Sequence, residues 1–554
     1  MTWTAATLQL NLRKARVLGV PCISIPIDSN NVLWAAFQPC VWSILDRLPL
    51  SWSSYPDFIR YSRRGWQFTD RSETHFHLGP VWALVSPVTM YLHISDPKAI
   101  SEIFARRVDF IKPVEEYKLL EVYGPCISTV GDDWARHRKV LAAPFNESIM
   151  EFVWDESLRQ AKSMLRYWTS KAESEVLSVQ RDTRTLSLNV LASAAFRKSY
   201  KFHGSSEPVI DEAGSYRDSL QIVLDNIIPL MLVPYRLLTS PIIPKSWARV
   251  GNAAASFKEH MRNMIEKETA ALEQGESGSG GIMTPFARAL QTHIQETQAS
   301  KQNIDNVKRG LSIDEIFGNM FVINFAGHDT TAITFSFSML LLAANPSVQE
   351  WLSKEISAVT KDIPIEEWDY KTLFPALKRC RAVMFETLRI YPPIMALPRL
   401  TSRETQTIPV GDRMLAIPPG VKTTICLKAM QSNSDFWPDP ETWRPSRWIS
   451  QSASVSVSSS EQGLNEELLS AKPNTYFPWS DGPQKCPGKK FSEVEAVAVL
   501  ACIFKQHRLF IKKKADESDE AAQQRVMACT RQVNLEALLK MVKPDQVTLI
   551  CKQT

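Results

Sequence analysis

The chain has 554 residues, of which 44% are hydrophobic and 22% charged, a composition that supports a large buried core and excludes an intrinsically disordered protein. The formal net charge of +5 is too small to indicate nucleic-acid binding. The cysteines are scattered without Cys-x-x-Cys spacing, which argues against a zinc site and suits a reducing compartment.

The N-terminal region contains no clear membrane-spanning sequence. An apolar stretch from Val17 to Leu45 is broken by prolines and polar residues, so it lacks the run of about 20 apolar residues that a span requires. The part from Val32 to Leu45 suits a helix that lies in a membrane interface or packs on the protein. We therefore expect residues 1–50 to form a membrane-associating or packing segment and residues 51–554 to form one large domain.

Trp134 and Arg138 lie four positions apart on a predicted short helix, so their side chains share one face. An indole N–H and a guanidinium on one face can together donate hydrogen bonds to an anion.

Two connecting segments follow. The apolar, proline-containing segment from Ile227 to Ile243 is interpreted either as an ordinary helix-to-helix connection or as a membrane contact. The glycine- and serine-rich segment from Gln274 to Gly281 predicts a flexible linker.

A long helix is predicted in the middle of the chain. Ser312 followed by Glu315 is a capping-box start, and apolar residues then run on nearly all sides to Leu342, just before Pro346. A helix that is apolar all round is either buried or membrane-spanning. Polar residues inside this one argue against a span, namely Asn319, Asn324, His328 and Asp329.

The run Ala326-Gly327-His328-Asp329-Thr330-Thr331 interrupts that helix. A glycine costs a helix about 1 kcal/mol relative to alanine, so Gly327 either opens a notch for a ligand or allows close packing. Thr330 can bond back to its own helix. Taken alone, these residues favour close packing, and His328 suits a packing or surface role better than metal binding.

Glu386 and Arg389 lie three apart on a helix that ends at Tyr391-Pro392-Pro393. If they join Arg447 in a buried network, arginine's fork of donors would hold the carboxylate rigidly, and we interpret the trio as structural. The alternative is a set of unrelated surface charges, each pair worth well under about 1 kcal/mol.

The C-terminal part contains two expected surface excursions. Gln451 to Gly463 is serine-rich, and Lys512 to Arg531 is charged and precedes the last predicted strands near Val547 to Cys551.

Cys486 stands in the run Trp479-Ser480-Asp481-Gly482-Pro483-Gln484-Lys485-Cys486-Pro487-Gly488-Lys489, between two glycines and ahead of a helical pattern. The partial positive charge of a helix N-terminus favours a thiolate over a thiol. A fixed, shielded thiolate is what a haem iron needs as an axial ligand. The alternative is a buried free cysteine between two turns.

The Cys486 run resembles the haem-binding loop of the cytochrome P450 family, Phe-x-x-Gly-x-Arg-x-Cys-x-Gly, with Trp479 in the Phe position. Gln484 stands where the family usually has Arg or His, a residue that normally contacts a haem propionate; an amide can still donate a hydrogen bond. Four further segments match in the family's order, namely Trp134 to Arg138, Ala326 to Thr331, Glu386 to Arg389 and Trp443 to Trp448.

The resemblance implies a mainly α fold with a minor β part, in which a long central helix lies over a haem and the cysteine loop lies on its proximal side. Residues 51–554 would then be the catalytic domain. Cys486 would bind the iron of protoporphyrin IX, while Asp329 and Thr330 would hold water and deliver protons. The other implied cofactor-binding residues are Trp134, Arg138, Arg399, Gly482, Gln484 and Gly488. The apolar side chains expected to line the substrate pocket are Phe325, Ala326, Ile394, Met395, Ala396 and Leu397.

The implied function is a haem-thiolate monooxygenase that inserts one oxygen atom of O2 into a lipophilic small molecule. Its electrons would come from NADPH through a separate cytochrome P450 reductase. The reductase would dock on a basic face, whose alternative is an ordinary solvated surface. The residues expected on this face are Arg136, Arg138, Lys139, Lys485, Lys489 and Lys490.

Gly482-Pro483-Gln484 and the Lys-Lys-Phe-Ser after Gly488 look most like filamentous-fungal members, many of which tailor terpenoids, polyketides or alkaloids. The resemblance places the protein on the cytosolic face of the endoplasmic reticulum, in peripheral or monotopic association. Two alternatives are a haem-thiolate isomerase or dehydratase that needs no reductase, and a non-catalytic haem-binding protein. Isomerases of this kind often lack the acid–threonine pair that is present here as Asp329-Thr330.

Overall fold

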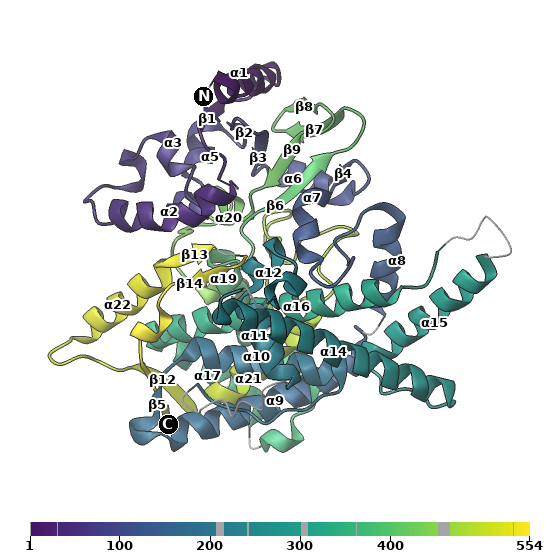
Figure 1. Ribbon diagram of the computed structural model, residues 1–554. Helices are drawn as coiled ribbons and strands as arrows, with labels where there is room; N and C mark the ends of the chain where they lie inside the picture. The colour runs from purple at the N-terminus through teal and green to yellow at the C-terminus, as the bar shows by residue number, and fades with distance from the viewer. Residues whose placement is uncertain are drawn as a thin grey trace.

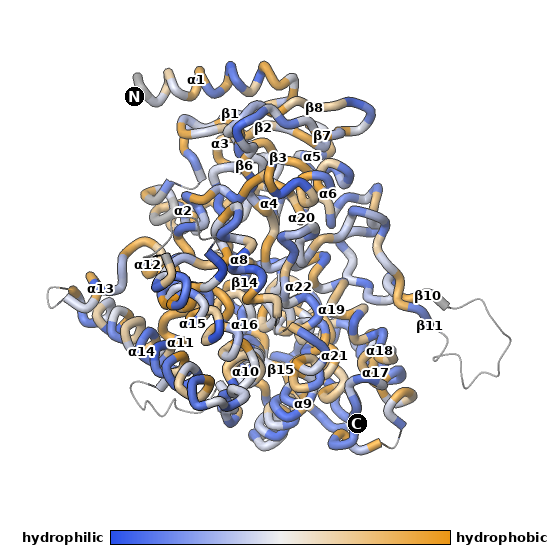
Figure 2. Tube along the Cα trace, turned by 90° about the vertical axis from the view of Figure 1, so that its right-hand side faces the viewer, coloured by the Kyte–Doolittle hydropathy of each residue, from blue (hydrophilic) through white to orange (hydrophobic). Residues whose placement is uncertain are grey.

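The computed structural model describes residues 2–29, 31–143, 145–205, 215–240, 243–300, 308–361, 363–451, 466–535 and 537–554. It is mainly helical with small sheets, as the resemblance predicts, and its two termini lie at opposite ends of the molecule in Figure 1 and in Figure 2. The fold class is therefore confirmed.

The central helix α16 (Ile313–Ala344) begins and ends where the sequence predicts. The Ser312 side chain accepts a hydrogen bond from the Glu315 backbone, and the Glu315 carboxylate accepts one from the Ser312 N–H at 2.8 Å. The helix is 32 residues long and is followed by Pro346 at the start of α17 (Pro346–Thr360). Nearly all of its middle and C-terminal half is buried, so it is a core helix.

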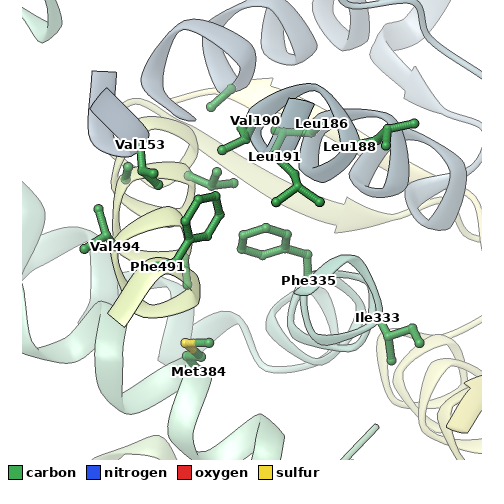
Figure 3. Packing of buried hydrophobic residues seen from close by; sticks show 14 of the residues in the cluster. Val153, Leu186, Leu188, Val190, Leu191, Ile333, Phe335, Met384, Phe491 and Val494 are labelled. Atoms are coloured by element: carbon green, nitrogen blue, oxygen red, sulfur yellow. The ribbon is translucent and has the colours of Figure 1, made fainter. Parts of the chain in front are cut away.

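The main core lies between α16 and the helices packed around it. These are α10 (Val179–Phe196), α19 (Lys378–Ile390), α21 (Lys489–Phe504) and α22 (Asp519–Arg531), and α9 (Glu147–Ser170) packs on α10 and α21. Figure 3 shows Phe335 of α16 and Phe491 of α21 pointing toward one another beneath Leu191 of α10. This packing fixes α21, and therefore the loop that precedes it, against the central helix.

Further helices cover the core or connect its parts. They are α7 (Val114–Tyr117), α8 (Gly131–Ala142), α11 (Tyr216–Asp225), α12 (Ile227–Leu232), α13 (Tyr235–Leu238), α14 (Lys245–Glu273), α15 (Met283–Ser300), α18 (Tyr370–Ala376) and α20 (Leu427–Gln431). The segment from Ile227 to Ile243 thus carries two short helices between α11 and α14, within the described residues.

The largest sheet has the order β1-β2-β3-β9-β6-β4. Its strands are β1 (Cys22–Ser24), β2 (Val81–Val85), β3 (Met90–Ile94), β4 (Phe110–Ile111), β6 (Leu397–Thr401) and β9 (Lys422–Ile425). All five residues of β2 are buried because the sheet lies between two apolar clusters, one around Val81 and Ala83 and the other around Trp82 and Leu84. A strand buried on both faces explains the unbroken apolar run in its sequence.

The smaller sheets lie farther along the chain. One joins β12 (His507–Ile511), β15 (Leu549–Gln553) and β5 (Glu175–Val176). Three strand pairs complete the set, namely β7 (Gln406–Val410) with β8 (Arg413–Ile417), β10 (Ile449–Gln451) with β11 (Glu466–Leu468), and β13 (Val533–Leu535) with β14 (Leu539–Met541).

The N-terminal segment contains α1 (Thr2–Val17), β1 and α2 (Val32–Leu45), and is followed by α3 (Asp57–Arg60), α4 (Trp66–Asp70), α5 (Glu73–Leu78) and α6 (Pro97–Ala105). Strand β1 pairs in parallel with β2, and α1 lies beyond it at the top of Figure 2. In α2, Trp42 is buried whereas Leu33, Phe37 and Ile44 are exposed, so the outer side of this helix is apolar.

Within the described residues, no single helix has the length and hydropathy to cross a bilayer. The two helices α16 and α17 reach that threshold only together, as a pair bent by 109°.

Two segments differ from the sequence-based expectation. The glycine-rich segment that predicted a flexible linker is held by the buried Glu268 of α14, whose carboxylate accepts hydrogen bonds from the Ser279 N–H at 2.9 Å and from the Thr284 hydroxyl at 2.5 Å. The charged excursion from Lys512 to Arg531 contains α22, because Ser518 caps its N-terminus and Val526 lies in the core. Of the serine-rich segment, residues 452–463 lie outside the described residues.

Candidate active site

The Cys486 loop is a tight turn at the start of α21. Cys486 donates its N–H to the Trp479 carbonyl at 2.9 Å, and Lys485 donates to the Gly482 carbonyl at 3.2 Å. Gly488 is the N-cap residue of α21, so the sulfur lies within three residues of a helix N-terminus. The Cys486 side chain is exposed, unlike Cys502 in the middle of the same helix.

Gly482 is required by the local backbone. Its φ is +68°, a conformation that favours glycine, and a Cβ there would clash with the Phe104 carbonyl of α6. At Gly488, an added Cβ would lie 3.8 Å from the Cys486 sulfur, which is an ordinary contact. The two predicted glycines therefore differ, since only Gly482 is fixed by crowding.

The surroundings of the Cys486 thiol act on its pKa in opposite directions. Burial among the surrounding protein atoms raises the pKa of the Cys486 thiol, while the Gly488 backbone amide and the Arg138 charge act in the opposite direction. Cys486 is nevertheless an exposed residue. A thiol in this situation loses its proton when a metal cation binds it, so the loop fits a metal ligand.

Three cations gather near this loop, namely Arg138 of α8, Arg399 of β6 and Lys112 just after β4. Burial lowers the pKa of Arg138, and it lowers the pKa of Lys112 to about 8 with added effects of Arg399 and Arg138. Arg399 is 4% exposed, and its guanidinium lies 5.9 Å from the Phe104 ring. Among the described residues, none of the three cations pairs with a carboxylate.

Trp134 and Arg138 lie on α8 as predicted, and Trp134 is buried with the Arg107 guanidinium 5.0 Å from its ring. Gln484 is half-buried on the cysteine loop. Arg399 is buried, while Arg138 and Lys112 are half-buried, and cations without acidic partners in such places need an anion to offset their desolvation. The two carboxylates of a haem supply that charge, so these residues fit a haem beside the Cys486 loop.

Sequence reasoning did not find Lys112. It belongs to none of the recognised motifs, and its closeness to Arg399 results from strand pairing between segments almost 290 positions apart.

The central helix has one accessible stripe. Ala326 is exposed, and Val322, Ile323 and Thr330 are partly exposed, whereas their neighbours Phe321, Asn324 and Asp329 are buried. The Thr330 hydroxyl donates to the Ala326 carbonyl at 2.8 Å. Positions 322, 323, 326 and 330 share one helix face, so the stripe can contact a bound ligand.

Gly327 does not open that stripe. A Cβ at this position would lie 3.0 Å from a methyl carbon of Leu191, on α10. The interpretation of Gly327 as a notch for a ligand is therefore wrong, and its role is close packing of α10 on α16.

Asp329 is only 2% exposed and is held by several cations. The Arg184 Nε donates to its Oδ1 at 2.6 Å, and the Lys540 Nζ lies 3.7 Å from its Oδ2. Burial alone would raise the pKa of Asp329, but His328, Arg184 and Lys540 together hold it well below the usual range. The group is therefore a carboxylate at neutral pH, and Arg184 also pairs with Asp225 of α11.

His328 is completely buried beside Asp329, with its Nδ1 2.6 Å from the Asn324 carbonyl. Within the described part of the chain, no cluster of three or more His, Cys, Asp or Glu residues could hold a metal ion.

The six residues expected in the substrate pocket divide into two groups. Ala326 is exposed and Ile394 is 42% exposed, while Ala396 and Leu397 are partly exposed. In contrast, Phe325 is 9% exposed with its ring 6.4 Å from that of Phe321, and Met395 is 2% exposed. Phe325 and Met395 therefore lie mainly in the core.

Glu386, Arg389 and Arg447 meet in one network. Both carboxylate oxygens of Glu386 accept from Arg389, at 2.8 and 2.9 Å, and one also accepts from Arg447 at 2.9 Å. The Trp448 indole and the Arg444 backbone N–H donate to the same carboxylate. Because Glu386 and Arg389 are completely buried, the network fixes the segments around Pro445–Trp448 to α19.

The predicted basic face is smaller than expected. Arg136 is 7% exposed at its side chain and is paired with Glu315 at 2.5 Å, so it belongs to the start of α16. Lys490 is paired with Glu147. The exposed cations around the cysteine loop are Lys139, Lys485, Lys489 and Lys490.

Comparison with known proteins agrees with this arrangement. The family model described as Cytochrome P450 matches residues 57–537. A cytochrome P450 monooxygenase of Arthrobotrys oligospora is 26% identical over 98% of this chain and 95% of its own length. Cytochrome P450 monooxygenase 124 of Postia placenta is 28% identical over 80% of both chains. The phomenoic acid biosynthesis cluster cytochrome P450 monooxygenase of Leptosphaeria maculans is 25% identical over 96% of this chain and 93% of its own.

Proposed function

The chain belongs to the cytochrome P450 family, whose matched relatives are monooxygenases, and from that premise we propose that Cys486 binds the iron of a haem in an enzyme that oxygenates a lipophilic fungal secondary metabolite. The observation that carries this proposal is the exposed Cys486 just before α21, beside Arg138 and the other cations that lack acidic partners. Bound haem supplies the activation of O2, with one oxygen atom transferred to substrate and the other reduced to water.

The cations near the loop position the cofactor. Arg138 and Arg399 can donate charge-assisted hydrogen bonds to carboxylates, and Trp134 can donate its indole N–H. Gly482 keeps the cysteine loop close to α6, and Gly488 starts the helix whose dipole favours the thiolate.

Thr330 and Asp329 hold the water that is needed for proton delivery. The Thr330 hydroxyl uses its proton for the Ala326 carbonyl, so its oxygen remains able to accept a hydrogen bond from a water in the accessible stripe. Asp329 is ionised and held by Arg184, so it orients water rather than donating a proton itself. Arg184 also reaches Asp225, whose side chain is 47% exposed, which provides a polar route to the surface.

The substrate class follows from the accessible side chains. Ala326, Ile394, Leu397 and the stripe residues Val322 and Ile323 are apolar, so they would select a lipophilic molecule mainly by shape. One matched relative is named as a member of a phomenoic acid biosynthesis cluster. This supports a secondary metabolite as substrate, and we propose a terpenoid, a polyketide or an alkaloid.

The electrons come from NADPH through a cytochrome P450 reductase. Lys139, Lys485 and Lys489 are exposed cations on the cysteine side and would contact its acidic surface. This docking face is narrower than the sequence suggested, since the Arg136 side chain is buried against Glu315.

The first 50 residues attach the enzyme to a membrane surface, and residues 51–554 form the catalytic domain. Leu33, Phe37 and Ile44 lie exposed along α2, and the chain continues with the exposed Leu48 and Leu50. An apolar helix face of this kind suits an in-plane position at the cytosolic face of the endoplasmic reticulum.

Reconstitution tests the proposed reaction. Purified protein is incubated with reductase, NADPH and a panel of lipophilic compounds, and matched samples omit NADPH. Product that appears only with NADPH, together with one oxygen atom from labelled O2, supports a monooxygenase. Product formed equally without electrons would instead indicate an isomerase or dehydratase, and haem binding with no NADPH consumption for any compound would indicate a non-catalytic protein.

A further inference from the structure

The helix that carries Trp134 and Arg138 is joined to the central helix by a small polar network. Among the described residues, the side-chain hydrogen bonds between α8 and α16 run through Arg136 and His137. The Arg136 guanidinium donates to both oxygens of the Glu315 carboxylate, at 2.5 and 3.0 Å, and the His137 Nε2 lies 3.4 Å from one of them. Because Trp134, His137 and Arg138 stand at positions i, i+3 and i+4, a contact that fixes His137 also fixes the directions of the other two.

Asn319 of α16 lies at the centre of this network and is completely buried. Its Oδ1 accepts a hydrogen bond from the Ile127 N–H at 2.9 Å. The amide nitrogen is thereby turned toward two acceptors, the His137 Nδ1 at 2.8 Å and the Glu315 carbonyl oxygen at 2.7 Å. Both N–H groups and the oxygen of the amide therefore have partners, and the His137 ring carries its proton on Nε2, toward the Glu315 carboxylate.

The loop before α8 lies directly against the start of α16. A Cβ added at Gly318 would lie 2.2 Å from the Gly124 carbonyl oxygen, and a Cβ added at Gly124 would lie 2.2 Å from the Asp314 carbonyl oxygen. Glycine at both positions allows this close approach, which brings the Ile127 N–H within hydrogen-bond distance of Asn319.

Asn319 also belongs to the helix face that carries the accessible stripe of α16. It stands seven positions before Ala326 and eleven before Thr330, so the three side chains lie nearly in line along the helix. The stripe is exposed at Ala326 and partly exposed at Thr330, whereas at Asn319 it is covered by His137 and Ile127. The network therefore fixes α8 at one end of the stripe.

We propose that Asn319 is a positioning residue, which sets the rotation of α8 against α16 through His137 and so holds Trp134 and Arg138 in place for a haem. This inference rests on the proposed function. Asn319 acts through His137 and not by its own contact with the cofactor, since its amide is fully used within the protein.

Asn324 provides a matched control on the same helix. It is also completely buried and donates to the carbonyl oxygen four positions before it, that of Met320 at 2.8 Å, as Asn319 does to that of Glu315. The remaining bond of Asn324 is with the Tyr216 hydroxyl of α11 at 3.0 Å and not with α8. Leucine at either position removes a buried amide and leaves a buried polar partner, so only the effect on α8 distinguishes the two variants.

The experiment measures how fast haem leaves the protein and how the haem carboxylates vibrate. Haem-loaded wild type, Asn319→Leu and Asn324→Leu are mixed with excess apomyoglobin, and haem transfer is followed by absorbance. Resonance Raman spectra of the same samples record the bands of the haem carboxylate groups. Asn319→Leu should lose haem about fivefold faster than wild type and show shifted carboxylate bands, because the hydrogen bond that fixes His137 is removed. Asn324→Leu should stay within about twofold of wild type, with unchanged bands.

Equal haem loss in wild type and Asn319→Leu would overturn the inference, and so would the same acceleration and band shift in Asn324→Leu. If Asn319→Leu is not recovered folded, His137→Phe replaces it, because it removes the same hydrogen bond from the side of α8 and should have the same effect.

A double variant tests whether Asn319 acts through His137. Asn319→Leu combined with His137→Phe should lose haem no faster than the faster of the two single variants, because two residues of one network do not act additively. Multiplied effects of the two substitutions would contradict the inference. A protein that binds haem through a thiolate but is insensitive to Asn319 contradicts only this inference, whereas a protein that does not bind haem contradicts the proposed function.

Discussion

Replacing Glu495 with glutamine tests the interior of α21, the helix that carries the Cys486 loop. Glu495 is completely buried, and neither carboxyl oxygen makes a well-formed hydrogen bond within the described chain. Burial raises the pKa of Glu495 from its ordinary value of 4.5 to about 8, with a small opposing effect of the Ser187 hydroxyl. The carboxyl group is therefore neutral in the folded enzyme at pH 7.

The raised pKa makes the stability pH-dependent. The folded state keeps a proton on Glu495 that the unfolded state releases above about pH 4.5, so stability falls as pH rises from about 4.5 to about 8 and levels off above it. Each tenfold change in proton affinity is worth about 1.4 kcal/mol, which gives a penalty of roughly 3 kcal/mol at pH 7 and roughly 5 kcal/mol above pH 8. Glutamine does not titrate, so Glu495→Gln escapes this penalty.

The assay compares urea-unfolding midpoints of wild type and Glu495→Gln by pulse proteolysis at several pH values. The free energy of unfolding of Glu495→Gln, relative to that of wild type, should rise by about 1.4 kcal/mol per pH unit between pH 5 and pH 7.5. The control is Glu350→Gln, since Glu350 is 58% exposed at its side chain and pairs with Arg508 at 2.8 Å. Glu350→Gln should change the free energy of unfolding by less than about 1 kcal/mol at every pH. A difference for Glu495→Gln that does not change with pH would refute the reasoning.

Three further substitutions probe the site and its support. Gly482→Ala should lower the haem content of the purified protein several-fold, measured as haem per chain, because its methyl group collides with the Phe104 carbonyl. Glu386→Gln should reduce the free energy of unfolding by about 3–5 kcal/mol in urea titrations, since it leaves buried arginines beside a neutral group; an unchanged midpoint would contradict this. Thr330→Val should raise peroxide formed per NADPH, because it removes the hydroxyl beside Ala326, and coupling equal to wild type would exclude Thr330 from proton delivery.

An element is predicted best from the sequence where its ends depend on residues close together along the chain. The start of α16 follows from Ser312 and Glu315, which are three positions apart, and its end follows from Pro346. The α22 helix was missed although its signal was present, since the buried residues Ala522, Val526 and Cys529 recur at helical spacing. The charged composition of Lys512 to Arg531 indicates a surface excursion, and the apolar periodicity within it indicates a helix.

Contacts between segments that are far apart along the chain are the features that the sequence predicts least well. Whether Gly327 faces a ligand or Leu191 depends on the rotation of α16 against α10. The partner of Arg136 is Glu315, which lies far along the chain, so the sequence does not show that Arg136 is buried. The Gly/Ser-rich segment is likewise held by residues outside it, among them Glu268 of the preceding helix. Lys112 has no motif around it, and its place beside Arg399 follows from strand register alone.

The carbon monoxide difference spectrum of the reduced, haem-supplemented protein tests most directly whether the Cys486 sulfur holds the iron. We expect a strongly red-shifted band in the wild-type protein and its loss in Cys486→Ser, because a serine oxygen donates less electron density than a thiolate. A colourless wild-type protein, or the same red-shifted band in Cys486→Ser, would contradict the assignment on which the proposed chemistry depends.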